Sequence, residues 1–128
     1  MEDGLPLDAA LATALRPLSP RAAFLHCCAQ GVLAYQVAQP SGQVVFYPRL
    51  VAPGTGETTL EWRRSRGRGT VHALTRHAGA GIALVDMAEG FRLLGPVEGA
   101  ARIGAEVEVV FRQPAEGDIH PAFQVIAA

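Results

Sequence analysis

The chain contains no lysine, only two cysteines and few aromatic residues, 6% of its 128 residues. All eleven of its basic residues are arginine, and twelve acidic residues bring the formal net charge to −1. A near-neutral charge gives no general attraction to nucleic acid or to an anionic membrane. Hydrophobic residues make up 49% of the chain, which is typical of one globular unit with a real core.

The two cysteines, Cys27 and Cys28, are adjacent. Neighbouring residues do not readily close a relaxed disulfide, so we expect two reduced, buried thiols, as in a cytoplasmic protein. Adjacent side chains on a helix also diverge, so the pair does not converge on a metal ion with His26.

Long apolar segments are missing as well. No apolar run approaches the roughly 18 residues of a transmembrane helix. The first twenty residues begin acidic and are interrupted by Pro6, Pro17 and Pro20, unlike a signal peptide. The sequence therefore predicts a cytoplasmic protein without a membrane partner.

Two helices are predicted at the N-terminus. Leu7, Leu11 and Leu15 form a one-sided helical stripe in residues 7–16, which Pro17 ends. Ser19 is suited to cap a second helix that starts at Pro20 and stops at Gly31.

From Val32 onward, eight short β-prone runs are separated by glycine-bearing turns. This pattern of short strands and turns is typical of an antiparallel barrel or sandwich, and a barrel of five strands is typical of an OB fold. The sequence divides into a helical segment, a two-loop β segment and a five-stranded unit: 1–31, 32–66 and 67–128. The runs are 32–37, 43–47, 58–63, 69–76, 81–87, 91–98, 105–112 and 121–127.

Two loops of the middle segment resemble each other. Residues 38–42, AQPSG, and residues 52–56, APGTG, share the outline of Cys-x-x-Cys-Gly zinc knuckles, with no cysteine in either loop.

The motifs G-x-L-x-Y-Q, F-Y-P-R, L-E-W, G-R-G-T-V, A-L-V-D-M-A-E-G and R-I-G-x-x-V-E-V-V-F follow one another in this order from about Phe24 to Phe123. Their order resembles the acyl-CoA-associated zinc-ribbon/OB-fold family, domain of unknown function family 35 (DUF35). The resemblance implies a mainly β fold: an N-terminal helical segment, a rubredoxin-like ribbon and a C-terminal five-stranded OB-fold barrel.

The same resemblance implies a non-catalytic accessory subunit. Such proteins work with a thiolase-fold enzyme (a thiolase, synthase or aldolase) that acts on acyl-CoA, and can help to shape the CoA channel. We therefore expect no directly bound cofactor, although acyl-CoA can be contacted in the complex.

The chain departs from the family pattern at the four zinc-ligand positions, which fall on Ala38, Ser41, Ala52 and Thr55. Alanine has no donor atom and neutral hydroxyls are poor substitutes for thiolate, so we expect a ribbon without zinc. Packing of Phe46, Tyr47, Leu50 and Trp62, together with partner contact, is expected to replace the metal. The connection between the first two barrel strands is also shorter than the family pattern.

Four arginines, Arg63, Arg64, Arg66 and Arg68, precede the barrel. Because guanidinium groups bind phosphate in a bidentate manner, the cluster is a candidate for the phosphates of CoA. It can equally meet an acidic partner or form a solvated loop.

The candidate partner interface is Phe46, Tyr47, Pro48, Arg49 and Trp62, together with the helical segment. We also expect Arg49 to bridge the ribbon and the barrel, and Asp86 and Glu89 to shape the tight hairpin at 87–91.

Two other functions remain open. A free-standing OB module could bind a small ligand or single-stranded nucleic acid, but the predicted strands display Glu98, Glu106 and Glu108 in place of a basic, aromatic groove. A hydrolase acting on acyl-CoA would need a nucleophile motif, and the sequence has no Gly-x-Ser-x-Gly.

Overall fold

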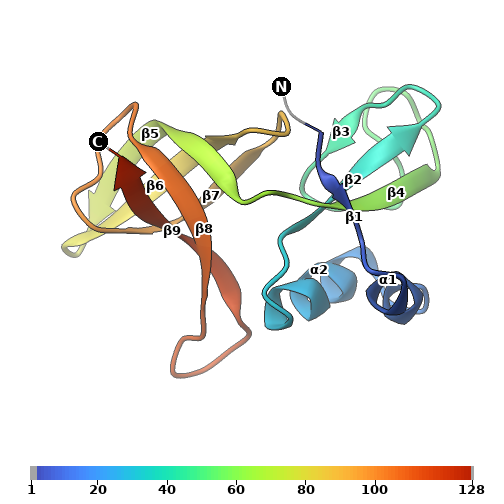
Figure 1. Cartoon of the computed structure of the whole chain (residues 1–128), viewed down its shortest axis with the longest axis horizontal. Coiled ribbons are helices and arrows are strands. Elements are labelled where there is room, and N and C mark those ends of the chain that lie inside the picture. The colour runs from blue at the N-terminus through green and yellow to red at the C-terminus, as the bar shows by residue number, and fades with distance from the viewer. Residues whose placement is uncertain (1–2, 128) are drawn as a thin grey trace.

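The computed structural model of the protein describes residues 3–127. Two short helices and a small sheet lie on one side of the molecule and a closed barrel on the other (Figure 1). This architecture confirms the predicted mainly β fold, with N-terminal helices and a five-stranded barrel. Within residues 3–127, no helix combines the length and the apolar character of a membrane span.

The helices are α1 (Ala9–Leu15) and α2 (Pro20–Ala29), and each starts at a side-chain cap. The Asp8 carboxylate accepts hydrogen bonds from the first turn of α1, and the Ser19 hydroxyl accepts one from the Ala22 N–H of α2. These bonds satisfy N–H groups that have no partner inside a helix. After α2, Gly31 takes a positive φ of 72° and turns the chain toward the sheet.

The small sheet, which we call the ribbon, has the order β1-β4-β2-β3 with antiparallel pairs. The sequence analysis missed β1 and predicted a longer β3, over 43–47. The third strand is short because Phe46 leaves the sheet and packs against the barrel and α2. The strands are β1 (Leu5–Pro6), β2 (Ala34–Gln39), β3 (Val44–Val45) and β4 (Thr59–Arg64).

The barrel closes in the order β5-β6-β7-β9-β8. Its neighbours pair antiparallel except β7 and β9, which are parallel. Strand β5 bends at a register shift between Val71 and Ala73 and so joins both β6 and β8. The strands are β5 (Arg68–His77), β6 (Ala80–Met87), β7 (Arg92–Glu98), β8 (Glu106–Arg112) and β9 (His120–Ala127).

The connection between β5 and β6 is a two-residue turn, in line with the short connection expected from the sequence. Ala78 and Gly79 both have positive φ, 51° and 82°. Two consecutive positive φ values are typical of a type I′ hairpin, which suits glycine at either position. Ala78 therefore holds a conformation that is unfavourable for a residue with a Cβ atom.

The main core fills the barrel and continues into the ribbon. Alternate residues of β6 and β7 point inward, so that Val85, Leu93 and the β9 residue Phe123 are buried. A smaller cluster joins the helices to the ribbon around Leu15, Cys27 and Ala34. Cys27 and Cys28 are free thiols, as predicted, and burial raises their pKa values to about 11 and 12.

Candidate functional site

The two knuckle-like loops have the same backbone hydrogen bonds. In the first loop, the Gly42 N–H donates to the Ala38 carbonyl (2.7 Å) and the Ala38 N–H donates to the carbonyl of residue 43 (2.8 Å). In the second, the N–H of Gly56 donates to the Ala52 carbonyl (3.1 Å), and that of Ala52 donates to the carbonyl of residue 57 (2.9 Å). The similarity of the two loops, noticed in the sequence, thus extends to their backbone hydrogen bonds.

The side chains at the two alanine positions face a common interior. Ala38 and Ala52 are both almost fully buried and form a small cluster with Val45, against which Leu60 packs. The methyl groups stand where the resemblance places two zinc ligands. At these two positions, apolar contacts now connect the loops.

The other two positions, Ser41 and Thr55, belong to a polar network centred on Glu57. The Glu57 carboxylate accepts hydrogen bonds from the Ser41 hydroxyl and from the Ser41 N–H (2.9 Å). These two bonds, the side-chain bond first, lower the pKa of Glu57. Since Ser41 and Glu57 come from different loops, a carboxylate links the loops across the surface.

Gln43 provides a second link between the loops. Its side-chain amide donates to the Pro53 carbonyl (3.0 Å), and its amide oxygen lies 3.4 Å from the Thr55 hydroxyl. The sequence analysis named neither Gln43 nor Glu57. Each is the residue that directly follows the glycine of its loop, a shared spacing that could have drawn attention to the pair.

The ribbon meets the barrel and α2 through stacked aromatic rings. The ring of Phe46 lies 4.7 Å from that of Phe91 and 5.6 Å from that of Phe24, between centroids. Tyr35 of β2 stacks on the other side of Phe91 at 5.0 Å. Phe46 is therefore occupied by contacts within the chain, which leaves less of its ring for a partner than the sequence analysis expected.

A buried carboxylate fixes the linker between ribbon and barrel. Glu89, 1% exposed, accepts hydrogen bonds from the Ser65 hydroxyl (2.6 Å) and the Arg66 N–H (2.9 Å). We expected Glu89 to shape its own hairpin; it instead ties that hairpin to a segment 23 residues away in sequence. This correction needed the tertiary structure, because the donors lie in another part of the chain.

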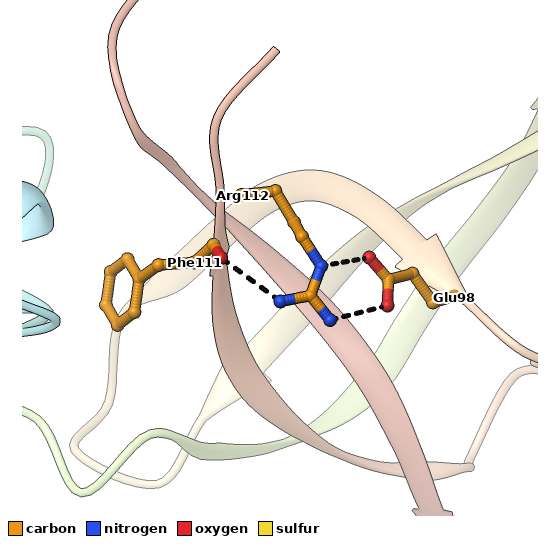
Figure 2. Close-up of polar contacts among 3 residues, drawn as sticks. All are labelled: Glu98, Phe111 and Arg112. Atoms are coloured by element: carbon orange, nitrogen blue, oxygen red, sulfur yellow. Dashed lines mark hydrogen bonds and ion pairs between the residues drawn. The ribbon is translucent and has the colours of Figure 1, made fainter.

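Asp86, the other residue expected to shape the hairpin, lies on the outer surface of the barrel. Its carboxylate pairs with Arg92 at 2.6 Å and with the His72 imidazole at 3.2 Å. At the opposite end of β7, Glu98 binds Arg112 through two parallel hydrogen bonds of 2.8 and 2.9 Å (Figure 2). This fork lowers the pKa of Glu98 and raises that of Arg112.

Of the four arginines between residues 63 and 68, three are directed at different acceptors. Arg63 pairs with Glu61 (3.4 Å), and Arg68 lies 3.9 Å from Glu108. The Arg66 side chain donates to the backbone carbonyl of Asp3, also at 3.4 Å. Arg64 is exposed and, within residues 3–127, has no ion pair.

Arg63 has one unusual feature. Its Nε is buried and has no hydrogen-bond acceptor among the residues that the structure describes. The side chain borders a hollow shared with Asp3, Tyr35 and Glu89. Two carboxylates beside this hollow disfavour a phosphate there, so Arg64, the other arginine at the end of β4, is better placed than Arg63 for an anion.

The remaining interface candidates lie at the edges of two hollows, of which the larger is mainly apolar and the smaller is mixed. Tyr47 and Pro48 line a hollow of about 400 Å³ between α2, β7 and the start of β9. Arg49 and Trp62 line a second hollow, of about 220 Å³, beside α1. The structure thus brings four of the five predicted interface residues to these hollows. The fifth, Phe46, packs against Phe24 and Phe91.

The expected roles of Arg49 and of three packing residues need correction. Within the described residues the Arg49 side chain makes no bridge to the barrel; its backbone N–H and carbonyl are held by the Gln36 side chain at 2.8 and 3.0 Å. Tyr47 and Leu50 are exposed, and Trp62 packs against the helices. They do not fill the space between the ribbon strands, which is occupied by the alanine cluster.

The described part of the chain contains no group of three or more His, Cys, Asp or Glu side chains arranged to hold a metal ion. The absence of zinc from the natural protein stays a prediction, which elemental analysis can test.

Comparison with solved structures places this arrangement among known folds. The protein superimposes with a TM-score of 0.72 and 21% identity on a chain described as the Ltp2-ChsH2(DUF35) aldolase, covering 82% of this chain and 93% of that one. It also matches a DUF35 protein of unknown function from Sulfolobus solfataricus, with a TM-score of 0.68, 15% identity and 92% coverage of both chains. The chain has the fold of the DUF35 proteins.

This DUF35 fold agrees with the resemblance found in the sequence motifs. Comparison with protein-family models and with curated proteins gives no match. The conclusion about fold therefore depends on structural similarity over most of the chain, supported by the order of the motifs.

Proposed function

We propose that this protein is a non-catalytic accessory subunit that assembles with a thiolase-fold enzyme acting on acyl-CoA. The observation that carries the proposal is its similarity to the DUF35 chain of an aldolase, over 93% of that chain. The order of the sequence motifs supports the same assignment. The hollows beside α1 and α2 supply apolar surface for such a contact.

The proposal is tested by isolating the tagged chain from its native source and identifying what co-purifies. A thiolase-fold protein is expected in fixed stoichiometry, and its activity on acyl-CoA is expected to fall when this chain is removed. Recovery of the chain without a thiolase-fold protein would contradict the proposal. So would hydrolysis of acyl-CoA by the isolated chain, or salt-dependent binding of single-stranded oligonucleotides, which indicates the OB-module alternative.

We further propose that CoA contact, where it occurs in the complex, involves the arginines before the barrel. Arg64 and Arg68 are exposed, and guanidinium groups suit phosphate. Arg64→Ala is expected to weaken acyl-CoA binding by the complex, and Arg76→Ala, an exposed arginine at the far end of β5, serves as the matched control. Equal binding by the two variants would contradict phosphate contact through Arg64 and leave the other two roles of the cluster, an acidic partner or a solvated loop.

A further inference from the structure

The two hollows beside the helices belong to one continuous face. Consecutive residues line them: Pro48 borders the larger hollow and Arg49 the smaller one. At the start of α2, Arg21 borders the larger hollow and Pro20 the smaller one. The segment from 47 to 50 and the start of α2 therefore form a shared wall. We call this surface the docking face.

Exposed apolar side chains gather on the docking face. Leu94, at 55% exposed, and Tyr47, also at 55%, border the larger hollow from β7 and from the segment after β3. Leu50, at 75%, and Leu18 border the smaller one, and Val51 follows directly. A group of exposed large apolar side chains on one face is typical of a protein interaction site.

The charges on this face have one sign. The charged residues that line the two hollows are Arg16, Arg21 and Arg49. The other ionisable side chains of the lining are His120 and Tyr47, and no carboxylate lines either hollow. Within residues 3–127, none of the three arginines forms an ion pair or donates a side-chain hydrogen bond. Elsewhere in the described residues some arginines are paired with acids, as in the Arg112–Glu98 fork, and others, such as Arg64, are not.

This charge pattern distinguishes between possible occupants. A second copy of the chain, docked face to face, would bring the arginines of both copies together. Like charges opposed across an interface oppose association. A segment with apolar side chains and carboxylates matches both the exposed apolar side chains and the arginines of this face.

We infer that the docking face binds a segment of the partner enzyme that presents large apolar side chains flanked by Asp or Glu. The inference rests on the proposed function for the existence of that partner, and adds the surface and the chemistry of the contact. An apolar side chain enters the hollow between Tyr47 and Leu94, and a carboxylate next to it pairs with Arg21 at the start of α2.

Site-specific photo-cross-linking in the isolated complex tests the location. A benzoylphenylalanine replaces Leu94 or Tyr47, and the matched control replaces Ile103, a barrel-loop residue that is 68% exposed. Positions 94 and 47 are expected to cross-link to the partner, through peptides that contain Asp or Glu near apolar residues, and position 103 is not.

Charge reversal tests the chemistry. Arg21→Glu is expected to weaken the complex about tenfold or more, because it places a carboxylate opposite a carboxylate. The helix tolerates this change, since an acidic residue in the first turn is favourable there. Arg76→Glu, on the barrel, is the matched control and is expected to leave the affinity unchanged.

The outcomes separate this inference from the proposed function. Cross-linking of a thiolase-fold partner through position 103 and not 94 or 47 overturns the docking face and leaves the proposed function intact. Position 94 could instead cross-link to a protein that is not thiolase-like, through a peptide with acidic and apolar residues, in a complex that Arg21→Glu weakens. That result supports the docking face and overturns the proposed function. A homodimer that dissociates on Leu94→Glu overturns the docking face by placing a second copy on it, and an absence of any bound protein overturns both.

Discussion

The barrel and the ribbon of this protein are both small, mainly antiparallel structures, but they are stabilised in different ways. The barrel closes on itself around large buried side chains such as Val85, Leu93 and Phe123. The loops of the ribbon enclose only Ala38, Val45 and Ala52, with Leu60 at their side. Because apolar stabilisation follows the area removed from water, the barrel gains far more from its interior than these loops do.

The difference shows what connects the two loops, which lack the thiolates of the pattern they resemble. Structural zinc contributes on the order of 10–16 kcal/mol of apparent binding free energy in small peptides. Four sets of contacts stabilise the ribbon of this chain: the alanine cluster, the Glu57 network, the aromatic stack on the barrel and the Glu89 link. We expected packing and a partner to supply the stability; the structure adds two carboxylates to that explanation.

The largest effect is expected from the barrel core. Phe123→Ala removes a fully buried ring and is expected to cost about 3–5 kcal/mol of unfolding free energy. Denaturant titration followed by far-UV circular dichroism measures the loss. Leu94→Ala, on the same barrel but exposed, is expected to change stability by less than about 0.5 kcal/mol. A similar loss in both variants would mean that the barrel interior does not dominate the stability.

Glu89→Ala breaks the link between the two regions. It leaves the Ser65 hydroxyl and the Arg66 N–H without their acceptor, and the expected cost is about 2–4 kcal/mol. Trp62, the single tryptophan, lies in the ribbon, so its fluorescence follows that region. In the variant, fluorescence is expected to change before circular dichroism does. Glu106→Ala, an exposed barrel carboxylate, is the control, and coincident transitions in Glu89→Ala would contradict a linking role.

Ala78→Gly is expected to stabilise the barrel by about 0.5–1 kcal/mol, because glycine takes a positive φ without steric conflict. Thermal unfolding measures the gain. Ala80→Gly, two residues away at the start of β6, should destabilise the chain, because glycine weakens a strand. A loss of stability in Ala78→Gly would show that the turn is not strained.

Glu57→Gln tests the network that joins the ribbon loops. Hydrogen bonds from Ser41 lower the pKa of Glu57 in the folded chain. The contribution of Glu57 to stability is therefore complete above its ordinary pKa of 4.5 and disappears as the pH falls through the lowered pKa. The natural chain is therefore expected to lose ribbon stability on acidification below about pH 4.5, followed by Trp62 fluorescence. The ribbon of the Glu57→Gln variant should be less stable at neutral pH and should lack this acid transition. An unchanged acid transition would assign it to other carboxylates, such as Glu98.

The smallest expected effect is that of a chelator. Protein purified without EDTA should contain no stoichiometric zinc, and EDTA should leave its melting temperature unchanged. Elemental analysis and thermal unfolding provide the two measurements. One zinc per chain would contradict the prediction of a metal-free ribbon.

Most of the fold could be predicted from local sequence. The Ser19-Pro20 start and the Gly31 stop of α2 were correct, because capping and glycine effects act within a few residues. The eight predicted strands appear within a few residues of their predicted places, apart from the shortened β3. Strand β1 was missed because two residues, Leu5 and Pro6, carry no periodicity.

Residue type and short spacing are enough to predict most of the strands, the helix caps, the paired loops and the absence of thiolates from those loops. The contacts that connect the loops could be found only in the tertiary structure. Glu57 and Ser41 are 16 residues apart, and Glu89 and Ser65 are 24 apart. No short-range pattern pairs such residues, because their contact exists only once sheet pairing and barrel closure have brought distant segments together.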